Sequence, residues 1–312
     1  MSTKKPKIAI SVGDLNGIGI EIALSAHEKI STYCEPIYCI NKTMLKNASQ
    51  LLELDIPKEF KIHNVKADFE IKPGQVTKKS GKFSYDSFCK AINLAKNKKV
   101  TSIVTLPVNK EAWNKAGIKY KGHTEVLRDF FGKNAIMMLG CKKMFVGLFT
   151  EHCALKKVPK KINEKDLTTF LLDFQKSVNA KKIGVLGLNP HASDNGVLGN
   201  EEVEIFKAIK NANKELNKEI FKGPLVPDTA FSPMSRKNYK YFVAMYHDQG
   251  LAPLKALYFD QSINVSLNLP IIRTSVDHGT AFDIAYKRNR KINIKSYVNA
   301  VKEAVVLHEK RK

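Results

Sequence analysis

Three histidines follow apolar runs that are typical of buried strands. His152 comes after "MFVGLFT", His191 after "KIGVLGLNP" and His247 after "YFVAMY". In an α/β sheet, ligands gather at the carboxyl ends of the strands. One histidine in such a place is more often structural, but three of the eight in the chain favour a shared site. Three neutral imidazoles suit Zn²⁺ or a similar first-row divalent ion and leave a coordination position open for catalysis.

The stretch around His247, "MYHDQGLAPLK", adds two charged side chains. Asp248 follows His247 directly, and Lys255 comes after what we interpret as a glycine turn. The simpler alternative is a core histidine with a satisfied hydrogen bond beside two solvated charges. Another alternative makes Cys153, which follows His152, a competing metal ligand. None of the five cysteines forms a CxxC pair, so we expect no disulfide framework, no thiolate zinc site and a reducing cytoplasm.

A second group of residues has the chemistry of an anion site. "GHTEVL" places His123 and Thr124 at a predicted helix start, where free N–H groups favour an anion. A plain N-cap by Thr124 is the alternative. Lys255, Asn264 and Arg273 follow His247 at intervals of eight, nine and nine residues, each near a predicted strand or turn edge. Lysine and arginine there would bind phosphate or carboxylate, and solvated surface charge is the alternative.

Two glycine-containing segments could contact a nucleotide. In "SVDHGTAFDIA", residues 275–285, His278-Gly279-Thr280 precedes a predicted helix, and an ordinary capped helix start is the alternative. "GDLNGIG", after the first predicted strand, lacks the GxGxxG spacing followed by an acid about twenty residues later. A Rossmann-type role for that loop is therefore not favoured.

The elements that must position these residues alternate between apolar strands and amphipathic helices. This pattern predicts an α/β fold with a largely parallel sheet covered on both faces. Asn163 is a predicted N-cap, with Asp166 three residues on, and residues 65–82 are predicted to form a long loop before a helix over 84–96. Other predicted strands include 7–12 and 101–108, and a terminal helix is predicted over about 294–309.

The charge balance is strongly basic. Lys and Arg number 52 against 30 Asp and Glu, which gives +22 over 312 residues. The excess is mostly scattered lysine, with no arginine-rich helix, RNP-like aromatic pair or zinc finger beside it, so we expect no nucleic-acid partner. No apolar run has the length that spans a bilayer, and the start lacks a signal-peptide pattern, so we expect no membrane partner.

Seven blocks of the sequence resemble, in order, the motifs of the 4-hydroxythreonine-4-phosphate dehydrogenase family of pyridoxal 5′-phosphate biosynthesis. The resemblance covers residues 8 to about 286. The blocks are "SVGDLNGIGIEI", "TLPVNKEA", "GHTEVL", "LNPHASDNGVLGNEE", "GPLVPDTAF", "AMYHDQGLAPLK" and "INVSLNLPIIRTSVDHGTAFDIA".

The resemblance implies a fold similar to isocitrate and isopropylmalate dehydrogenases, with two α/β/α domains and an interdomain cleft. The first domain would be 1–125 plus 270–312, with the nucleotide-binding loop, and the second 126–269, with the metal, substrate and dimer contacts. A cytoplasmic homodimer with its active site at the subunit interface is implied.

The resemblance also implies roles for individual residues. The metal ligands would be His152, His191 and His247, with Zn²⁺ favoured over Mg²⁺ or Co²⁺. Substrate would contact His123, Thr124, Lys255, Asn264 and Arg273, and NAD, or NADP, would contact Gly279, Thr280 and Asp283. His247, Lys255 and Asp248 would be catalytic, and whether Lys255 or Asp248 is the base is left open.

The implied reaction is the oxidative decarboxylation of 4-phosphooxy-L-threonine to 3-amino-2-oxopropyl phosphate, CO₂ and NADH. The alternative within the family is a D-threonate or D-erythronate 4-phosphate dehydrogenase. A nucleic-acid-binding protein would explain the charge, and a metal-dependent hydrolase would use the same histidines but leave "HGTAFDIA" without a role.

Overall fold

The computed structural model describes residues 5–287, 290 and 292–311. They form two compact units: the first runs to Asn134 and resumes at Ile263, and the second is Ala135–Ser262. The ends of the first expected domain, residues 1–4 and 312, lie outside the described residues.

The unit boundaries differ from the expected ones at 125/126 and 269/270. Helix α5 (His123–Phe131) is continuous, so the chain cannot change unit at residue 125. Strand β10 (Ile263–Leu267) pairs antiparallel with β11 (Ile272–Val276), which places it in the first unit. The continuous helix α5 and the paired strands β10 and β11 each stay within one unit, and they therefore set the boundaries.

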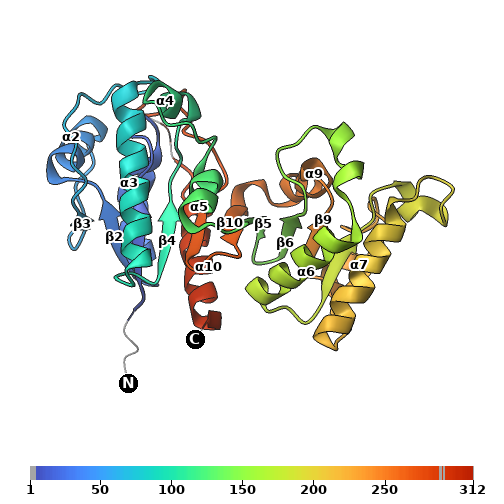
Figure 1. Ribbon diagram of the computed structural model, residues 1–312. Coiled ribbons are helices and arrows are strands. Elements are labelled where there is room, and N and C mark those ends of the chain that lie inside the picture. The colour runs from blue at the N-terminus through green and yellow to red at the C-terminus, as the bar shows by residue number, and fades with distance from the viewer. Residues whose placement is uncertain (1–4, 288–289, 291, 312) are drawn as a thin grey trace. The chain divides into compact units, whose positions relative to one another are not determined.

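The first unit has the strand order β3-β2-β1-β4-β11-β10. All neighbours except β10 and β11 are parallel. Helix α3 packs on β1, β2 and β4, and α10 packs on β4, β10 and β11 (Figure 1). The remaining elements are β1 (Lys7–Ser11), α1 (Gly19–Ser31), β2 (Glu35–Cys39), α2 (Lys42–Leu52), β3 (Lys61–His63), α3 (Lys78–Lys96), β4 (Ser102–Thr105), α4 (Lys110–Lys115) and α10 (Lys295–Arg311).

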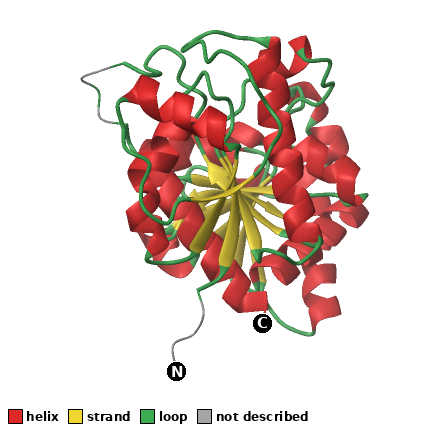
Figure 2. Ribbon diagram, turned by 90° about the vertical axis from the view of Figure 1, so that its left-hand side faces the viewer, coloured by secondary structure: helices red, strands yellow, loops and turns green. Residues whose placement is uncertain are grey.

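The second unit has the strand order β5-β6-β9-β7-β8, in which only the β5–β6 pair is antiparallel. Figure 2, in which the first unit faces the viewer, shows helices on both sides of the strands. The predicted α/β class with largely parallel sheets is therefore confirmed, both for the first unit and for the second. Its elements are β5 (Ile136–Cys141), β6 (Met144–Leu148), α6 (Glu164–Val178), β7 (Ile183–Leu186), α7 (Glu201–Leu216), β8 (Phe221–Leu225), α8 (Pro233–Asn238), β9 (Tyr241–Ala244) and α9 (His247–Tyr258).

Helix starts follow their capping residues. The side chain of Asn163 accepts a hydrogen bond from Asp166 N at 2.9 Å, as predicted for the start of α6. Helix α3 begins earlier than expected, because Thr77 caps it by accepting from Ser80 N at 3.2 Å. Residues 78–82, which we expected to be loop, are therefore helical.

Gly81 explains why that stretch looked like a loop. It lies inside α3, where a Cβ would be only 2.1 Å from the carbonyl oxygen of Ala112. The glycine therefore permits close packing of α3 against α4 rather than a turn.

The predicted glycine turn after His247 is also helical. Gly250 lies within α9, and a Cβ there would be 2.6 Å from Val146 Cγ1 and 3.0 Å from Ala244 Cβ. Gly250 thus lets α9 approach β6 and β9, and Lys255 lies on this helix rather than at a strand edge.

The helix predicted after Thr280 is absent from the described residues 281–287, which form only a short turn. Ile284 N and Ala285 N both donate to Ala281 O. Ala281 and Tyr286 have φ of 45° and 58°, so left-handed residues at both ends prevent the turn from extending as a helix.

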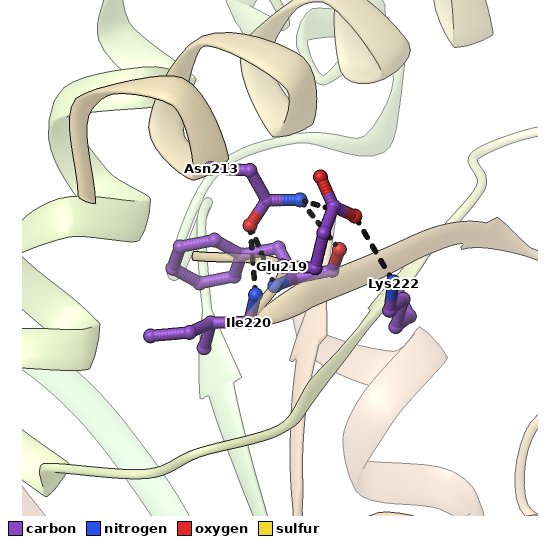
Figure 3. A network of polar contacts seen from close by, with 5 residues as sticks. Asn213, Glu219, Ile220 and Lys222 are labelled. Atoms are coloured by element: carbon purple, nitrogen blue, oxygen red, sulfur yellow. Dashed lines mark hydrogen bonds and ion pairs between the residues drawn. The ribbon is translucent and has the colours of Figure 1, made fainter. Parts of the chain in front are cut away.

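A buried amide joins α7 to β8 (Figure 3). Asn213 Oδ1 accepts from Ile220 N at 3.0 Å and Phe221 N at 2.9 Å, while its Nδ2 donates to Phe221 O at 2.9 Å. The adjacent pair of Lys222 and Glu219, 3.0 Å apart, lies at the surface.

In the part of the chain that the structure describes, no helix is both long and apolar enough to cross a membrane.

Candidate active site

The three histidines follow neighbouring strands of the second unit. Strands β6, β9 and β7 are parallel and adjacent in that order. His152, His247 and His191 respectively come after their carboxyl ends, so the fold delivers the three side chains to one edge of the sheet.

His152 and His247 lie close together. Their ring centroids are 5.6 Å apart and their planes are inclined by 40°. Two imidazoles on one tetrahedral ion, with metal–nitrogen bonds of about 2.1 Å, have ring centres roughly 5 Å apart. The pair therefore has a spacing that fits two ligands of one divalent ion.

Asp248 orients the ring of His247. Its Oδ1 lies 2.8 Å from His247 Nδ1, which leaves Nε2 available to a ligand. A carboxylate on the far nitrogen is the usual support of a metal-binding histidine, because it fixes the tautomer and the ring. Asp248 itself is exposed, with 83% of its side chain accessible.

His191 lies in a strained turn. Residues 191–195 all have positive φ, from 45° to 75°, and none is glycine. Such residues cost about 1–3 kcal/mol each and persist only where surrounding contacts hold them. Within the described residues of one chain, no three or more His, Cys, Asp or Glu side chains are grouped to hold a metal. The structure thus brings two of the predicted ligands together and not the third.

Arg273 forms the centre of a buried polar cluster in the first unit. It lies on β11, only 2% exposed, and donates to Ser266 Oγ at 3.1 Å and Thr105 Oγ1 at 2.8 Å. Burial lowers the pKa of Arg273 to about 9, which leaves it charged at neutral pH. Its buried Nε has no hydrogen-bond partner among the described residues, so the cluster has an unmatched positive charge and a free donor.

His123, the first residue of α5, faces the same charge. Its ring packs edge-on against Phe88 and Trp113, with centroids 4.6 Å and 5.7 Å away. Burial first, and then the charges of Arg273 and Lys110, hold the pKa of His123 well below 6.5. The ring is therefore neutral, and its buried Nε2 has no partner in the described structure.

Asn264 and Thr124 are the other residues of the predicted anion group that lie in this unit. Asn264 shares a sheet face with Ser266, which pairs with Arg273, and its buried Oδ1 has no partner among the described residues. Thr124 is not the cap of α5, because Gly122 occupies that position with φ 154° and no side chain caps the helix. The plain-cap alternative for Thr124 is therefore wrong.

Lys255 belongs to the second unit, with the histidines. Its Nζ lies 3.5 Å from Ser262 Oγ and 5.2 Å from the centre of the Phe259 ring. Both neighbours are near the end of α9, so the ammonium group is held at that end of the helix.

The expected cofactor residues Gly279, Thr280 and Asp283 lie in the loop after β11, and the "GDLNGIG" loop supports them. Ile18 N donates to Thr280 O at 3.1 Å, and a Cβ on Gly17 would be only 2.8 Å from that oxygen. Gly279 faces open space, since a Cβ there would meet nothing within 4 Å. The glycines of the first loop thus permit close packing.

Sequence reasoning missed three residues of the Arg273 cluster: Thr105, Ser266 and Lys110. The Cε of Lys110 would lie 3.8 Å from a Cβ on Gly122, next to His123. Thr105 and Lys110 both occur in the block "TLPVNKEA", which could have indicated them. All five cysteines are free thiols, as expected.

This chain is similar over nearly its whole length to proteins named 4-hydroxythreonine-4-phosphate dehydrogenase. The 4-hydroxythreonine-4-phosphate dehydrogenase of Sulfurimonas denitrificans is 62% identical over 98% of this chain and 99% of its own. That of Helicobacter pylori strain J99 is 50% identical over 96% and 98%. The crystal structure of the Klebsiella pneumoniae enzyme of the same name superposes with a TM-score of 0.83, at 30% identity, over 97% of this chain and 100% of that one.

The model of one family, "Pyridoxal phosphate biosynthetic protein PdxA", matches residues 32–304. Because that match and the identities above span most of the sequence, the chain belongs to the PdxA family.

Proposed function

We propose that this protein is an NAD-dependent 4-hydroxythreonine-4-phosphate dehydrogenase that needs a divalent metal. It would oxidise and decarboxylate 4-phosphooxy-L-threonine to 3-amino-2-oxopropyl phosphate, CO₂ and NADH. Relatives that cover nearly the whole chain carry this dehydrogenase name, which supports the assignment. Five free thiols are consistent with the reducing cytoplasm that we propose as its location.

The observation that carries the substrate class is the buried guanidinium of Arg273. Its charge is met only by two hydroxyl groups in the bonds described above, which do not neutralise it. A phosphate would supply the missing negative charge and accept from Nε. Neutral His123, with Thr124 and Asn264, would provide further polar contacts in the same unit, and Lys255 is a further proposed substrate contact.

The proposed metal ligands are His152, His247 and His191, with Zn²⁺ the favoured ion and Mg²⁺ or Co²⁺ the alternatives. The bound ion would supply Lewis-acid stabilisation of negative charge on the substrate. Asp248 would hold the His247 tautomer, and either Lys255 or Asp248 would accept the hydroxyl proton. Oxidation must come first, because loss of CO₂ needs an adjacent carbonyl to accept the electron pair. The loop of Gly279, Thr280 and Asp283 would hold NAD, or NADP, which would supply the hydride acceptor for the oxidation.

We also propose a homodimer with the active site at the subunit interface. Four apolar side chains between residues 197 and 206 are exposed: Val197 by 78%, Leu198 by 45%, Val203 by 51% and Phe206 by 57%. This apolar patch begins two residues after the strained turn of His191. A second copy that covers the patch would remove this apolar surface from water.

A substrate panel tests the proposed function. NADH formation should be fastest with 4-phosphooxy-L-threonine, should need an added divalent ion after chelation, and should be slower with D-threonate or D-erythronate 4-phosphate. Preference for either of these acids would select the alternative substrate. Phosphate release without NADH would instead indicate a hydrolase.

A further inference from the structure

Polar side chains bridge the three strand ends that precede the histidines. Strands β6, β9 and β7 are neighbours, and main-chain pairing ends at Leu148–Ala244 and Val185–Val243. Beyond these pairs, two main-chain bonds still join the β6 and β9 ends, from Phe149 N to Ala244 O and from Thr150 N to Met245 O, and side-chain hydrogen bonds reinforce the connection from one strand end to the next. The main-chain groups that these side chains bond lie on the segments that lead to His247 and His191, and Thr150 itself lies on the segment that leads to His152.

Thr150 makes the first bridge, between the ends of β6 and β9. Its Oγ1 donates to Met245 O at 2.7 Å, and its main-chain N donates to the same oxygen at 3.2 Å. Thr150 is 6% exposed. It stands two residues before His152, and Met245 stands two residues before His247. The bond therefore fixes the separation of the two segments that carry the close pair of rings.

Gln249 makes the second bridge, between the ends of β9 and β7. Its Oε1 accepts from Met245 N at 2.7 Å, and its Nε2 donates to Gly187 O at 2.6 Å. A single amide thus satisfies one main-chain donor and one main-chain acceptor on adjacent strands. An amide carries a donor and an acceptor on one planar group, whereas an ionised carboxylate only accepts and could keep only the bond from Met245 N.

Glu202 makes the third set of bonds, at the end of β7. It lies in the first turn of α7, 8% exposed, and its Oε1 accepts from Leu188 N at 2.8 Å and Asn189 N at 2.7 Å. Its Oε2 accepts from Asn189 Nδ2 at 2.8 Å. Bonds to a buried carboxylate are stronger than neutral ones. They hold the chain immediately before the left-handed run that starts at His191.

We propose that Thr150, Gln249 and Glu202 are positioning residues that set the spacing and direction of His152, His247 and His191 for a divalent cation. This inference rests on the metal of the proposed function. Each of the three acts on main chain within two residues of a histidine, or reaches across to the next strand end. They would tune affinity for the cation without touching it, as outer hydrogen-bonding partners of metal ligands do.

The first test removes one hydroxyl. Thr150→Val keeps the shape of the side chain and loses the hydroxyl bond to Met245 O, while the main-chain N–H bond to the same oxygen stays; Thr150→Ser keeps both bonds. Co²⁺ affinity, from titration of the visible absorption of the bound ion, should fall about 10- to 100-fold in Thr150→Val and stay near wild type in Thr150→Ser.

The matched control is Thr168→Val. Thr168 Oγ1 also donates to a main-chain oxygen, that of Glu164, at 2.7 Å, but within α6. This variant should bind Co²⁺ like the wild type.

A second pair of variants keeps the inference testable should Thr150→Val not fold. Gln249→Glu retains the acceptor for Met245 N and loses the donor to Gly187 O, so it should weaken Co²⁺ binding and change its absorption spectrum. Gln175→Glu, which removes a donor to Ala180 O at 3.4 Å beside α6, is its control and should change neither.

The possible outcomes are distinct. Thr150→Val and Gln249→Glu variants that melt lower but bind Co²⁺ with wild-type affinity and spectrum would show a purely structural role and overturn the inference. A wild-type protein that does not bind Co²⁺ at all would overturn the metal of the proposed function, and the positioning role with it. Weaker binding in the test variants alone supports the inference.

Discussion

The Arg273 guanidinium combines deep burial with hydroxyl partners, and this sets what it can bind. A group of this kind is stable in the apolar interior only when an anion or several hydrogen bonds compensate its lost hydration. Lysine at the same place would retain the charge but lose the planar fork that can hold two oxygens at once.

Arg273→Lys should raise KM for the phosphorylated substrate about 10- to 100-fold, since hydrogen bonds to charged groups contribute about 1.5–3 kcal/mol. Steady-state NADH formation measures this effect. Arg236→Lys is the control, because Arg236 bonds Phe231 O at 2.9 Å and Tyr258 Oη at 2.6 Å in the second unit. An unchanged KM in Arg273→Lys would remove Arg273 from the substrate site.

His123 makes stability depend on pH. In the unfolded chain it takes up a proton near pH 6.5, whereas burial holds its pKa well below that value in the folded chain. Its contribution to stability is therefore complete above pH 6.5 and is lost as the pH falls towards the folded pKa. His123→Gln removes the group, so the stability difference between wild type and variant should shrink from pH 7.5 to 5.5.

Urea unfolding at the two pH values measures this difference. Asp14 acts in the opposite sense, because burial raises its pKa to about 6. That effect is common to both proteins and cancels in the comparison. A difference that is constant with pH would contradict a buried, neutral His123.

At the scale of elements, a buried side-chain amide contributes more to the free energy of unfolding than a surface ion pair does. Asn213 satisfies two main-chain donors and one acceptor where α7 meets β8 (Figure 3). Asn213→Ala leaves them without a partner and should lower the free energy of unfolding by about 1–3 kcal/mol or more. Lys222→Ala breaks only the exposed pair with Glu219 and should cost under about 1 kcal/mol.

Urea unfolding of both variants provides the comparison. Equal losses in Asn213→Ala and Lys222→Ala would show that the main-chain groups of β8 find other partners. Activity is expected to follow stability in both, since neither residue belongs to the proposed site.

Most elements could be predicted from sequence because apolar periodicity and capping residues are local signals. Asn163 predicted the start of α6 correctly. The misjudged places are those where tertiary contacts decide: Gly81 and Gly250 indicated turns but lie in helices that pack closely on neighbours. Short elements such as β8 and α8 are too short to show a clear apolar periodicity. The turn at 281–286 depends on residues with positive φ, which the local sequence pattern does not indicate.

At the scale of the whole molecule, the sequence predicted two α/β units but not their boundaries, since motifs do not show where a helix or strand pair ends. It also identified residues that lie close together in the fold: His152 with His247 after neighbouring strands, and His123 near the buried charge of Arg273. The sequence did not indicate Thr150, Gln249 and Glu202, because hydrogen bonds between distant segments leave no recurrent residue spacing in the sequence.

The exposed apolar patch of residues 197–206 is the proposed binding surface for a second copy of the chain. Phe206→Lys places a charge in the patch and should convert the proposed dimer to monomer, with loss of NADH formation, as sedimentation velocity and activity would show. Leu51→Lys is the control, because Leu51 is similarly exposed, at 51%, on α2 of the first unit. A dimeric, active Phe206→Lys protein would locate the interface elsewhere.

The first unit is assembled from two separate stretches of chain, and this has a consequence for synthesis. Its strand β11 lies between β4 and β10, yet residues 272–276 leave the ribosome long after 102–105. The contiguous second unit can fold as soon as it emerges. Meanwhile β4 must wait with one edge unpaired, so a chain that terminates soon after residue 262 would hold one finished unit attached to an open, aggregation-prone half-sheet.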